Sequence, residues 1–97
     1  MNNYKIKSRA IEDLEIIFDF IAKDNKKAAG KLIKDFYNIF EKLSTFPELG
    51  KIRKDFTYQN VRFFVFKKHY LIIYNLEEES LCIQRVLTAY QDICSVL

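Results

Sequence analysis

Apolar side chains recur along this chain with two different periods, and each period predicts a type of element. Residues 3–7 alternate Tyr4 and Ile6 with lysines, which predicts a short strand with one buried face. Residues 8–23 place their apolar side chains on one face of a helix, with Ser8 as the candidate N-cap. A second helical pattern covers residues 26–46. Because only a few residues separate the two patterns, we expect an antiparallel helix hairpin.

Three strand-like runs with a period of two follow between residues 61 and 86. Lys67–Lys68 and Glu77–Glu79 separate the runs as short turns, so the runs should pair as an antiparallel meander. Residues 51–60 lack a clear period and are expected to form a connecting loop, which in a compact domain is often functional. The tail, residues 88–97, can form one short final helix.

The order of these elements predicts the fold class. We expect an α+β fold in two layers, with an N-terminal strand, an antiparallel helix hairpin, a three-stranded antiparallel meander and a short C-terminal helix. One face of the meander must bury its apolar side chains against the helices, and Phe36 and Phe40 supply matching bulk from the second helix. A chain of 97 residues has room for one core. Residues 1–97 are therefore expected to form a single domain.

Two finer expectations concern how these elements pack. Gly30 lies near the edge of the apolar arc of the second helix, so it should permit close approach of the first helix. In the last strand run, Arg85 falls on the same face as Leu81 and Ile83. An arginine on an apolar face is expected either to pair with an acid, for which Asp13 and Asp92 are candidates, or to serve a site.

Composition excludes several classes of protein. The chain has no apolar run of about 18 residues and no apolar region near its start, so we expect neither a membrane span nor a secretory signal. Cys82 and Cys94 lie outside any CxxC or Cys/His grouping, which predicts reduced thiols rather than a metal site. We therefore expect a cytoplasmic protein with no metal and no cofactor.

Positive charge is concentrated in one part of the chain. The net charge is only +3, but residues 51–70 carry six basic residues against Asp55 alone, a local net charge of +5. The six are Lys51, Arg53, Lys54, Arg62, Lys67 and Lys68. This favours an anionic partner, either nucleic acid or an acidic protein segment. The alternative is a solvated loop and strand edge.

The first helix carries an apolar pair on its polar side. Ile16 and Phe20 lie one turn apart, away from the apolar face and among charged residues such as Glu12 and Lys23. Such a pair is either tolerated exposure or a docking point for another molecule.

Several stretches together resemble a known family. They are YKIKSRAIEDLEII from Tyr4, the Ala28–Ala29 pair that opens the second helix, FPELGK from Phe46, Tyr74, and RVLTAYQD from Arg85. In this order they resemble the RelE/ParE superfamily, the toxins of type II toxin–antitoxin modules, and the ParE side more closely. The resemblance extends from Tyr4 to about Leu97, and the fold of the family matches the one expected above.

The resemblance implies a small bacterial toxin of the cytoplasm that a cognate antitoxin holds inactive. RelE-like members cleave mRNA on the ribosome, whereas ParE-like members act against DNA gyrase. In this family the antitoxin covers the toxin with a segment that usually includes an amphipathic helix in an apolar groove. Ile16 and Phe20 are the residues that this chain offers for antitoxin binding.

RNA cleavage requires a general base, a general acid and cations around the phosphate. Compared with RelE-like toxins, this chain has Leu71 at a common arginine position, Thr88 at a common histidine position and Gln91 at another common arginine position. A threonine hydroxyl and a glutamine amide do not titrate near neutral pH. The sequence therefore favours a toxin that inhibits gyrase by binding over an enzyme.

The candidate site residues follow from these two readings. For target binding we expect Lys51, Arg53, Lys54, Arg62 and Tyr90. For the alternative, a metal-independent endoribonuclease that acts on ribosome-bound mRNA, the weak catalytic candidates are Arg62, His69, Arg85 and Tyr90. His69 is the one histidine of the chain and falls at a turn. A third reading is a degenerate member that binds its antitoxin without toxicity.

Overall fold

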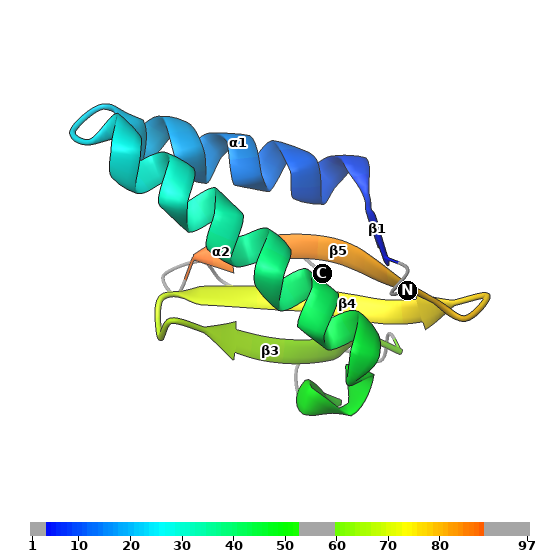
Figure 1. The fold of residues 1–97 in the computed structure, drawn as a ribbon. Coiled ribbons are helices and arrows are strands. Elements are labelled where there is room, and N and C mark those ends of the chain that lie inside the picture. The colour runs from blue at the N-terminus through cyan, green and yellow to red at the C-terminus, as the bar shows by residue number, and fades with distance from the viewer. Residues whose placement is uncertain (1–3, 53–59, 89–97) are drawn as a thin grey trace.

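The chain folds into a mixed β-sheet with a helix hairpin across one of its faces (Figure 1). The computed structural model describes residues 4–52 and 60–88. Its elements are β1 (Tyr4–Ile6), α1 (Ser8–Ala22), α2 (Lys26–Thr45), the 3-10 turn η1 (Pro47–Leu49), β2 (Lys51–Ile52), β3 (Arg62–Phe66), β4 (Tyr70–Glu77) and β5 (Ser80–Thr88). The expected two-layer α+β architecture is thereby confirmed.

The sheet of the described residues has five strands in the order β1-β5-β4-β3-β2. The meander of β3, β4 and β5 is antiparallel as expected, and β1 pairs in parallel with β5. The expected count of four strands was wrong, because Lys51–Ile52 pairs with β3 as the edge strand β2. A strand of two residues is too short to show a period, so only its pairing reveals it. The expected C-terminal helix falls outside the described residues.

The two helices begin in different ways. The expected cap at Ser8 was wrong: α1 begins at Ser8 itself, and the residue before it, Lys7, has extended backbone and no capping side chain. The Lys7 amide still donates to the Ile83 carbonyl of β5 at 2.9 Å, so the β1 pairing continues up to the first helical residue. By contrast, the Asn25 side chain caps α2 by accepting from the Ala28 amide at 3.0 Å.

The main core lies between the helix hairpin and the sheet. Phe36 of α2 contacts Phe66 and Tyr70 with ring centroids 5.1 and 5.2 Å apart, which joins the helix layer to the sheet. Other buried members are Leu14, Ile17, Phe40, Leu43, Ile72, Tyr74, Leu81, Ile83 and Val86. The expectation for Gly30 was wrong, because it is exposed and a Cβ there would meet no atom within 4 Å.

A β-bulge in β5 overturns the predicted facing of Arg85. Ile73 pairs with Arg85 and Tyr74 pairs with Ile83, so Gln84 is the extra residue. The bulge changes the alternation, and Val86 instead of Arg85 joins the core under the helices. Arg85 lies opposite Ile73, which packs with Val61, Phe63 and Leu87 in a separate buried cluster. Since paired residues share a face, the Arg85 side chain starts from the face of this second cluster and not among the core residues under the helices.

Candidate functional site

An apolar groove of about 440 Å³ lies where the second half of α1 meets one end of the sheet. We call it the docking groove, and its lining residues are Ile16, Ile17, Phe20, Ile21, His69, Tyr70 and Thr88. They come from three separate parts of the chain: α1, the β3–β4 connection with the start of β4, and the end of β5. The tertiary structure thus builds a concave surface that no single segment contains.

The α1 wall of the docking groove contains the apolar pair expected from the sequence. Ile16 and Phe20 are 67% and 74% exposed, and they follow each other by one helical turn. Ile17, beside them, is buried in the core. The groove therefore extends from the edge of the core onto the surface of α1. An exposed apolar area of this kind is unusual on a surface that no other molecule covers.

The opposite wall is the tip of the β3–β4 hairpin. Lys67 and Lys68 have φ of 53° and 64°, left-handed values that allow the chain to reverse between Phe66 and Tyr70, which pair directly. The Lys67 ammonium also donates to the Asp35 carboxylate of α2 at 2.6 Å. These contacts place His69, which is exposed like Lys67 and Lys68, at the groove.

Arg85 is held by Asp13 of α1. Its Nε and Nη2 donate to the two carboxylate oxygens at 2.8 and 3.0 Å, and the Val86 amide donates to one of them at 2.9 Å. The two side chains are only 13% and 11% exposed. The hydrogen bonds that Arg85 donates to Asp13 raise the pKa of Arg85, so the guanidinium stays charged. Of the expected acid partners, Asp13 is the one observed, while Asp92 lies outside the described residues.

A second network holds the segment that leads into β2. The fully buried Tyr74 hydroxyl donates to the Pro47 carbonyl at 2.5 Å and accepts from the Gly50 amide at 2.7 Å. Burial raises the pKa of Tyr74, which keeps the phenol protonated as a donor. Arg62 Nη1 donates to the Gly50 carbonyl at 2.8 Å. Pro47, Gly50 and Tyr74 were part of the sequence resemblance, and the structure explains why they occur together.

The expected target-binding residues fall at the β2–β3 edge of the sheet as far as they are described. Lys51 is exposed in β2, and Arg62 is half-buried in the neighbouring β3. Arg62 therefore has two candidate roles, because it supports Gly50 and also contributes positive charge to the edge. Arg53, Lys54 and Tyr90 lie outside the described residues.

The described catalytic candidates do not converge. Arg62 is opposite Tyr74, whose side chain joins the core under the helices, whereas Arg85 is opposite Ile73 of the other cluster. The guanidinium of Arg62 is held at the Gly50 carbonyl and that of Arg85 at Asp13 of α1, so the two are fixed at different places. His69 lies beyond the far end of β3 from Arg62, and the strand from Arg62 to Phe66 alone is about 13 Å long. Across residues 4–52 and 60–88, no group of three His, Cys, Asp or Glu could hold a metal ion.

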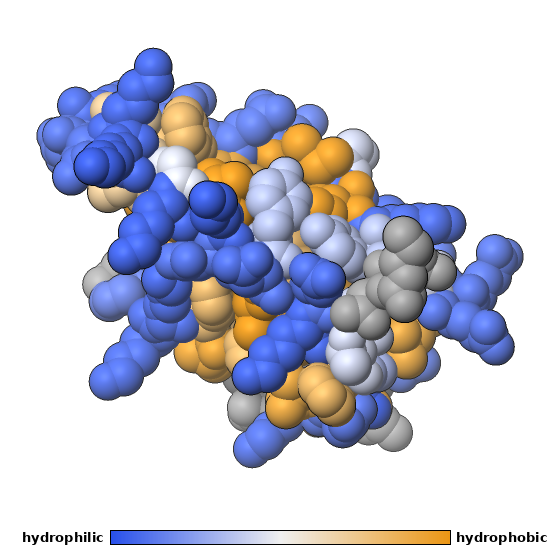
Figure 2. Space-filling view, in the orientation of Figure 1, coloured by the Kyte–Doolittle hydropathy of each residue, from blue (hydrophilic) through white to orange (hydrophobic). Residues whose placement is uncertain are grey.

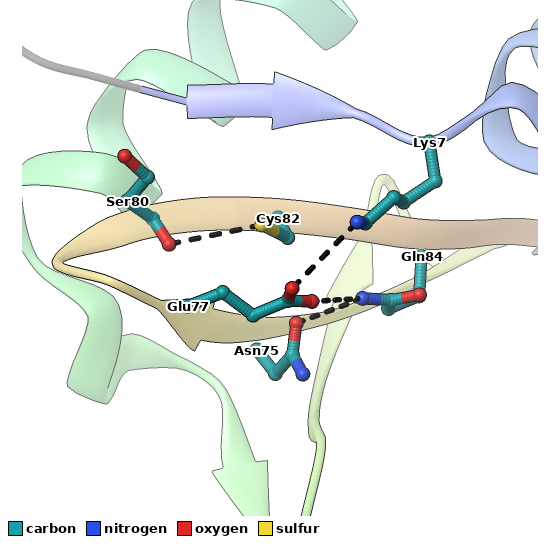
Figure 3. Close-up of polar contacts among 6 residues, drawn as sticks. All are labelled: Lys7, Asn75, Glu77, Ser80, Cys82 and Gln84. Carbon is teal, nitrogen blue, oxygen red and sulfur yellow. Dashed lines mark hydrogen bonds and ion pairs between the residues drawn. The ribbon is translucent and has the colours of Figure 1, made fainter.

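A polar cluster away from the docking groove links β4 and β5 with Lys7, the residue that follows β1 (Figure 3). Gln84 donates to Asn75 at 2.8 Å and to Glu77 at 3.2 Å, and Lys7 lies 3.7 Å from Glu77. The bulged residue Gln84 thus finds its partners within the sheet. Cys82 is buried beside them, and desolvation raises the pKa of its thiol, which opposes thiolate reactivity.

Residues 4–93 match the family described as the ParE toxin of the type II toxin–antitoxin system parDE. A solved structure described as the chromosomal ParDE TA system from P. aeruginosa superimposes with a TM-score of 0.72 at 19% identity, covering 91% of this chain and 96% of that chain. No curated protein matches the sequence. Among the described residues, no helix is both long and apolar enough to span a membrane.

Proposed function

This chain belongs to the ParE family of type II toxin–antitoxin toxins, and from that premise we propose that it arrests growth by binding DNA gyrase in the cytoplasm. The observation that carries the proposal is the separation of the described residues able to assist RNA cleavage. Arg62 is bound to the Gly50 carbonyl and Arg85 to Asp13, while Thr88 occupies the docking groove without a titrating group. A binding inhibitor needs none of these groups as an acid or base.

The proposed gyrase-binding surface is the basic edge of the sheet. Lys51 and Arg62 lie on neighbouring strands at that edge. Arg53, Lys54 and Tyr90, which the sequence assigns to the same role, lie outside the described residues. Concentrated positive charge raises the rate of encounter with an acidic or nucleic-acid-bound target. The Tyr74–Gly50 contact supports this surface because β2 begins at the next residue, Lys51.

Expression of the chain alone tests the choice of target. Early induction of the DNA-damage response and DNA breaks are expected if gyrase is bound. Rapid cleavage of mRNA at ribosome-positioned codons would instead establish the RelE-like ribonuclease, and unimpaired growth of cells with abundant folded protein would establish the degenerate reading.

Charge reversal tests the surface itself. The double variant Arg53→Glu, Lys54→Glu is expected to abolish growth arrest while leaving the fold intact, because it changes the local charge by four units on a long-range electrostatic surface. The matched control is Lys23→Glu, Lys26→Glu, two exposed residues on either side of the interhelical connection, with the same charge change elsewhere. Arrest that persists in the first variant, or is lost equally in both, contradicts the proposed surface.

We further propose that the antitoxin places an amphipathic helix in the docking groove. Ile16 and Phe20 present apolar side chains one turn apart beside the buried Ile17, which is the pattern that a helix-in-groove contact needs. The groove is concave and largely apolar, and the antitoxin is the partner that family membership implies.

Phe20→Asp is expected to weaken antitoxin binding about 30-fold, because it places a charge where a central apolar anchor should be desolvated. Isothermal titration of the purified chain with its antitoxin measures the change, and circular dichroism checks the fold. Val65→Asp is the control, since Val65 is an exposed apolar residue of β3 outside this groove. An unchanged affinity for Phe20→Asp would reject the docking groove as the antitoxin site.

A further inference from the structure

A second groove, of about 400 Å³, lies between the two helices on the outer side of the hairpin. We call it the hairpin groove, and its lining residues are Ile11, Leu14, Glu15, Phe18, Asp19, Ile33 and Tyr37. None of them lines the docking groove. Apolar surface is visible between α1 and α2 on the face drawn in Figure 2. The hairpin groove and the docking groove are therefore separate apolar surfaces, and the proposed antitoxin helix occupies only the docking groove.

The hairpin groove is open because the helices diverge from their connection (Figure 1). Near the wide end, Ile11 of α1 and Tyr37 of α2 are each 44% exposed, so both helices present apolar area to solvent there. Leu14 beneath them belongs to the core, which makes the floor of the groove rigid. Apolar area of this kind is stabilised when another molecule covers it.

The charges beside the groove are divided between the two helices. The solvent-facing side of α1 carries the exposed acids Glu12, Glu15 and Asp19, whereas that of α2 carries the exposed bases Lys27, Lys31 and Lys34. In the part of the chain that the structure describes, none of these six side chains forms an ion pair. The rim on α1 is thus mainly acidic, with Arg9 as its exposed base, and the rim on α2 is mainly basic, with Glu41 as its exposed acid. Glu15 and Asp19 line the groove itself, whereas the three lysines lie outside its lining.

We propose that the hairpin groove is an interface with a second copy of this chain. A two-fold axis along the groove places α1 of each copy over α2 of the other, so that each acidic rim faces a basic rim. In such an isologous contact, the pairing of an acidic rim with a basic rim occurs twice, once on each side of the axis. A partner of one charge sign would be attracted by one rim and repelled by the other, whereas a second copy satisfies both.

The positions of individual charges fit this arrangement. Glu15 lies seven residues before the end of α1 at Ala22, and Lys34 lies eight residues after the start of α2 at Lys26. The helices are antiparallel, so the two residues are at similar distances from the interhelical connection. Rotation about an axis along the groove does not change how far a residue lies from the interhelical connection. Glu15 of one copy therefore faces Lys34 of the other. In the same way, Ile11 of one copy faces Tyr37 of the other at the open end of the groove.

Sedimentation velocity of the purified full chain over a range of concentrations measures the association. The wild-type chain is expected to form dimers that weaken with added salt. Glu15→Lys and Lys34→Glu are each expected to raise the dimer dissociation constant about tenfold, since each places like charges together at both symmetry-related contacts. The double variant should regain the wild-type dissociation constant, and so should an equimolar mixture of the two single variants. In both cases each of the two contacts joins opposite charges.

The loss in the single variants is specific to the proposed axis. If α1 of one copy lay on α1 of the other, Glu15 would face Glu15, and reversing its charge would only replace one like-charged contact with another. Lys51→Glu, at the other side of the fold, is the matched control and should leave the dimer unchanged. A chain that stays monomeric at every concentration overturns the proposal. A dimer whose dissociation constant is unchanged by the Glu15 and Lys34 substitutions also overturns it. The same holds for a monomeric chain whose Glu15→Lys variant loses affinity for the antitoxin.

Discussion

Asp13→Ala is expected to lower the free energy of unfolding by about 3–5 kcal/mol, because it leaves a largely buried guanidinium without its counter-charge. Asp13 accepts three hydrogen bonds, two from Arg85 and one from the Val86 amide. All three donors would be left on a side of β5 that water reaches poorly, since the Asp13 and Arg85 side chains are mostly buried. The loss would be among the largest that one substitution outside the apolar core can cause here.

Urea unfolding followed by circular dichroism measures this change as a fall in the midpoint at constant slope. Glu12→Ala is the matched control, because Glu12 is the neighbouring carboxylate of the same helix and is exposed; we expect a change within about 0.5 kcal/mol. The double variant Asp13→Leu, Arg85→Met should recover much of the loss, since an apolar pair removes both buried charges. Equal effects of Asp13→Ala and Glu12→Ala would refute the structural role of the pair.

Gly50→Ala is expected to destabilise the fold by about 2–3 kcal/mol through overpacking against Tyr74. A Cβ at Gly50 would overlap the phenol of Tyr74 and lie 2.7 Å from its Cζ. The ring is fully buried and its hydroxyl is bound to Pro47 and Gly50, so it has no free space into which to move. The φ of Gly50 is −83°, which alanine adopts readily, and the expected loss is therefore steric.

Gly30→Ala provides the matched control with the opposite sign. Gly30 lies inside α2, where a Cβ would meet nothing within 4 Å. Alanine at such a helical position is expected to stabilise the protein by about 0.5–1 kcal/mol. Thermal unfolding of both variants checks the pair of expectations. A Gly50→Ala protein as stable as the wild type would show that Tyr74 does not hold η1 and β2 in the way described.

The secondary structure could largely be predicted because its signals are local. The apolar period of α1 and α2, and the alternation in β3 and β4, follow from side chains that neighbour each other along the chain. The exposure of Ile16 and Phe20 was predictable for the same reason, since the helical period alone places them away from the apolar face. The two residues of β2 and the extra residue Gln84 carry no such signal.

The docking groove could be predicted only in part. Its α1 wall follows from the helical period, but His69 and Thr88 join it because the β3–β4 turn and the end of β5 lie at the same end of the sheet. For the hairpin groove, the acidic α1 and the basic α2 are evident from the sequence. That the helices diverge enough to expose Ile11 and Tyr37 is evident only from the structure.

By itself the sequence determined the helix hairpin, the antiparallel meander, the two-layer class and the resemblance to ParE toxins, since each depends on local periodicity or on short motifs. Only the tertiary structure decided that β1 lies parallel to β5, that Asp13 pairs with Arg85 across 72 positions of the chain, and that Tyr74 holds Gly50. These contacts depend on strand order and on one bulge. A bulge reverses the facing of every residue after it, and no local pattern records that change.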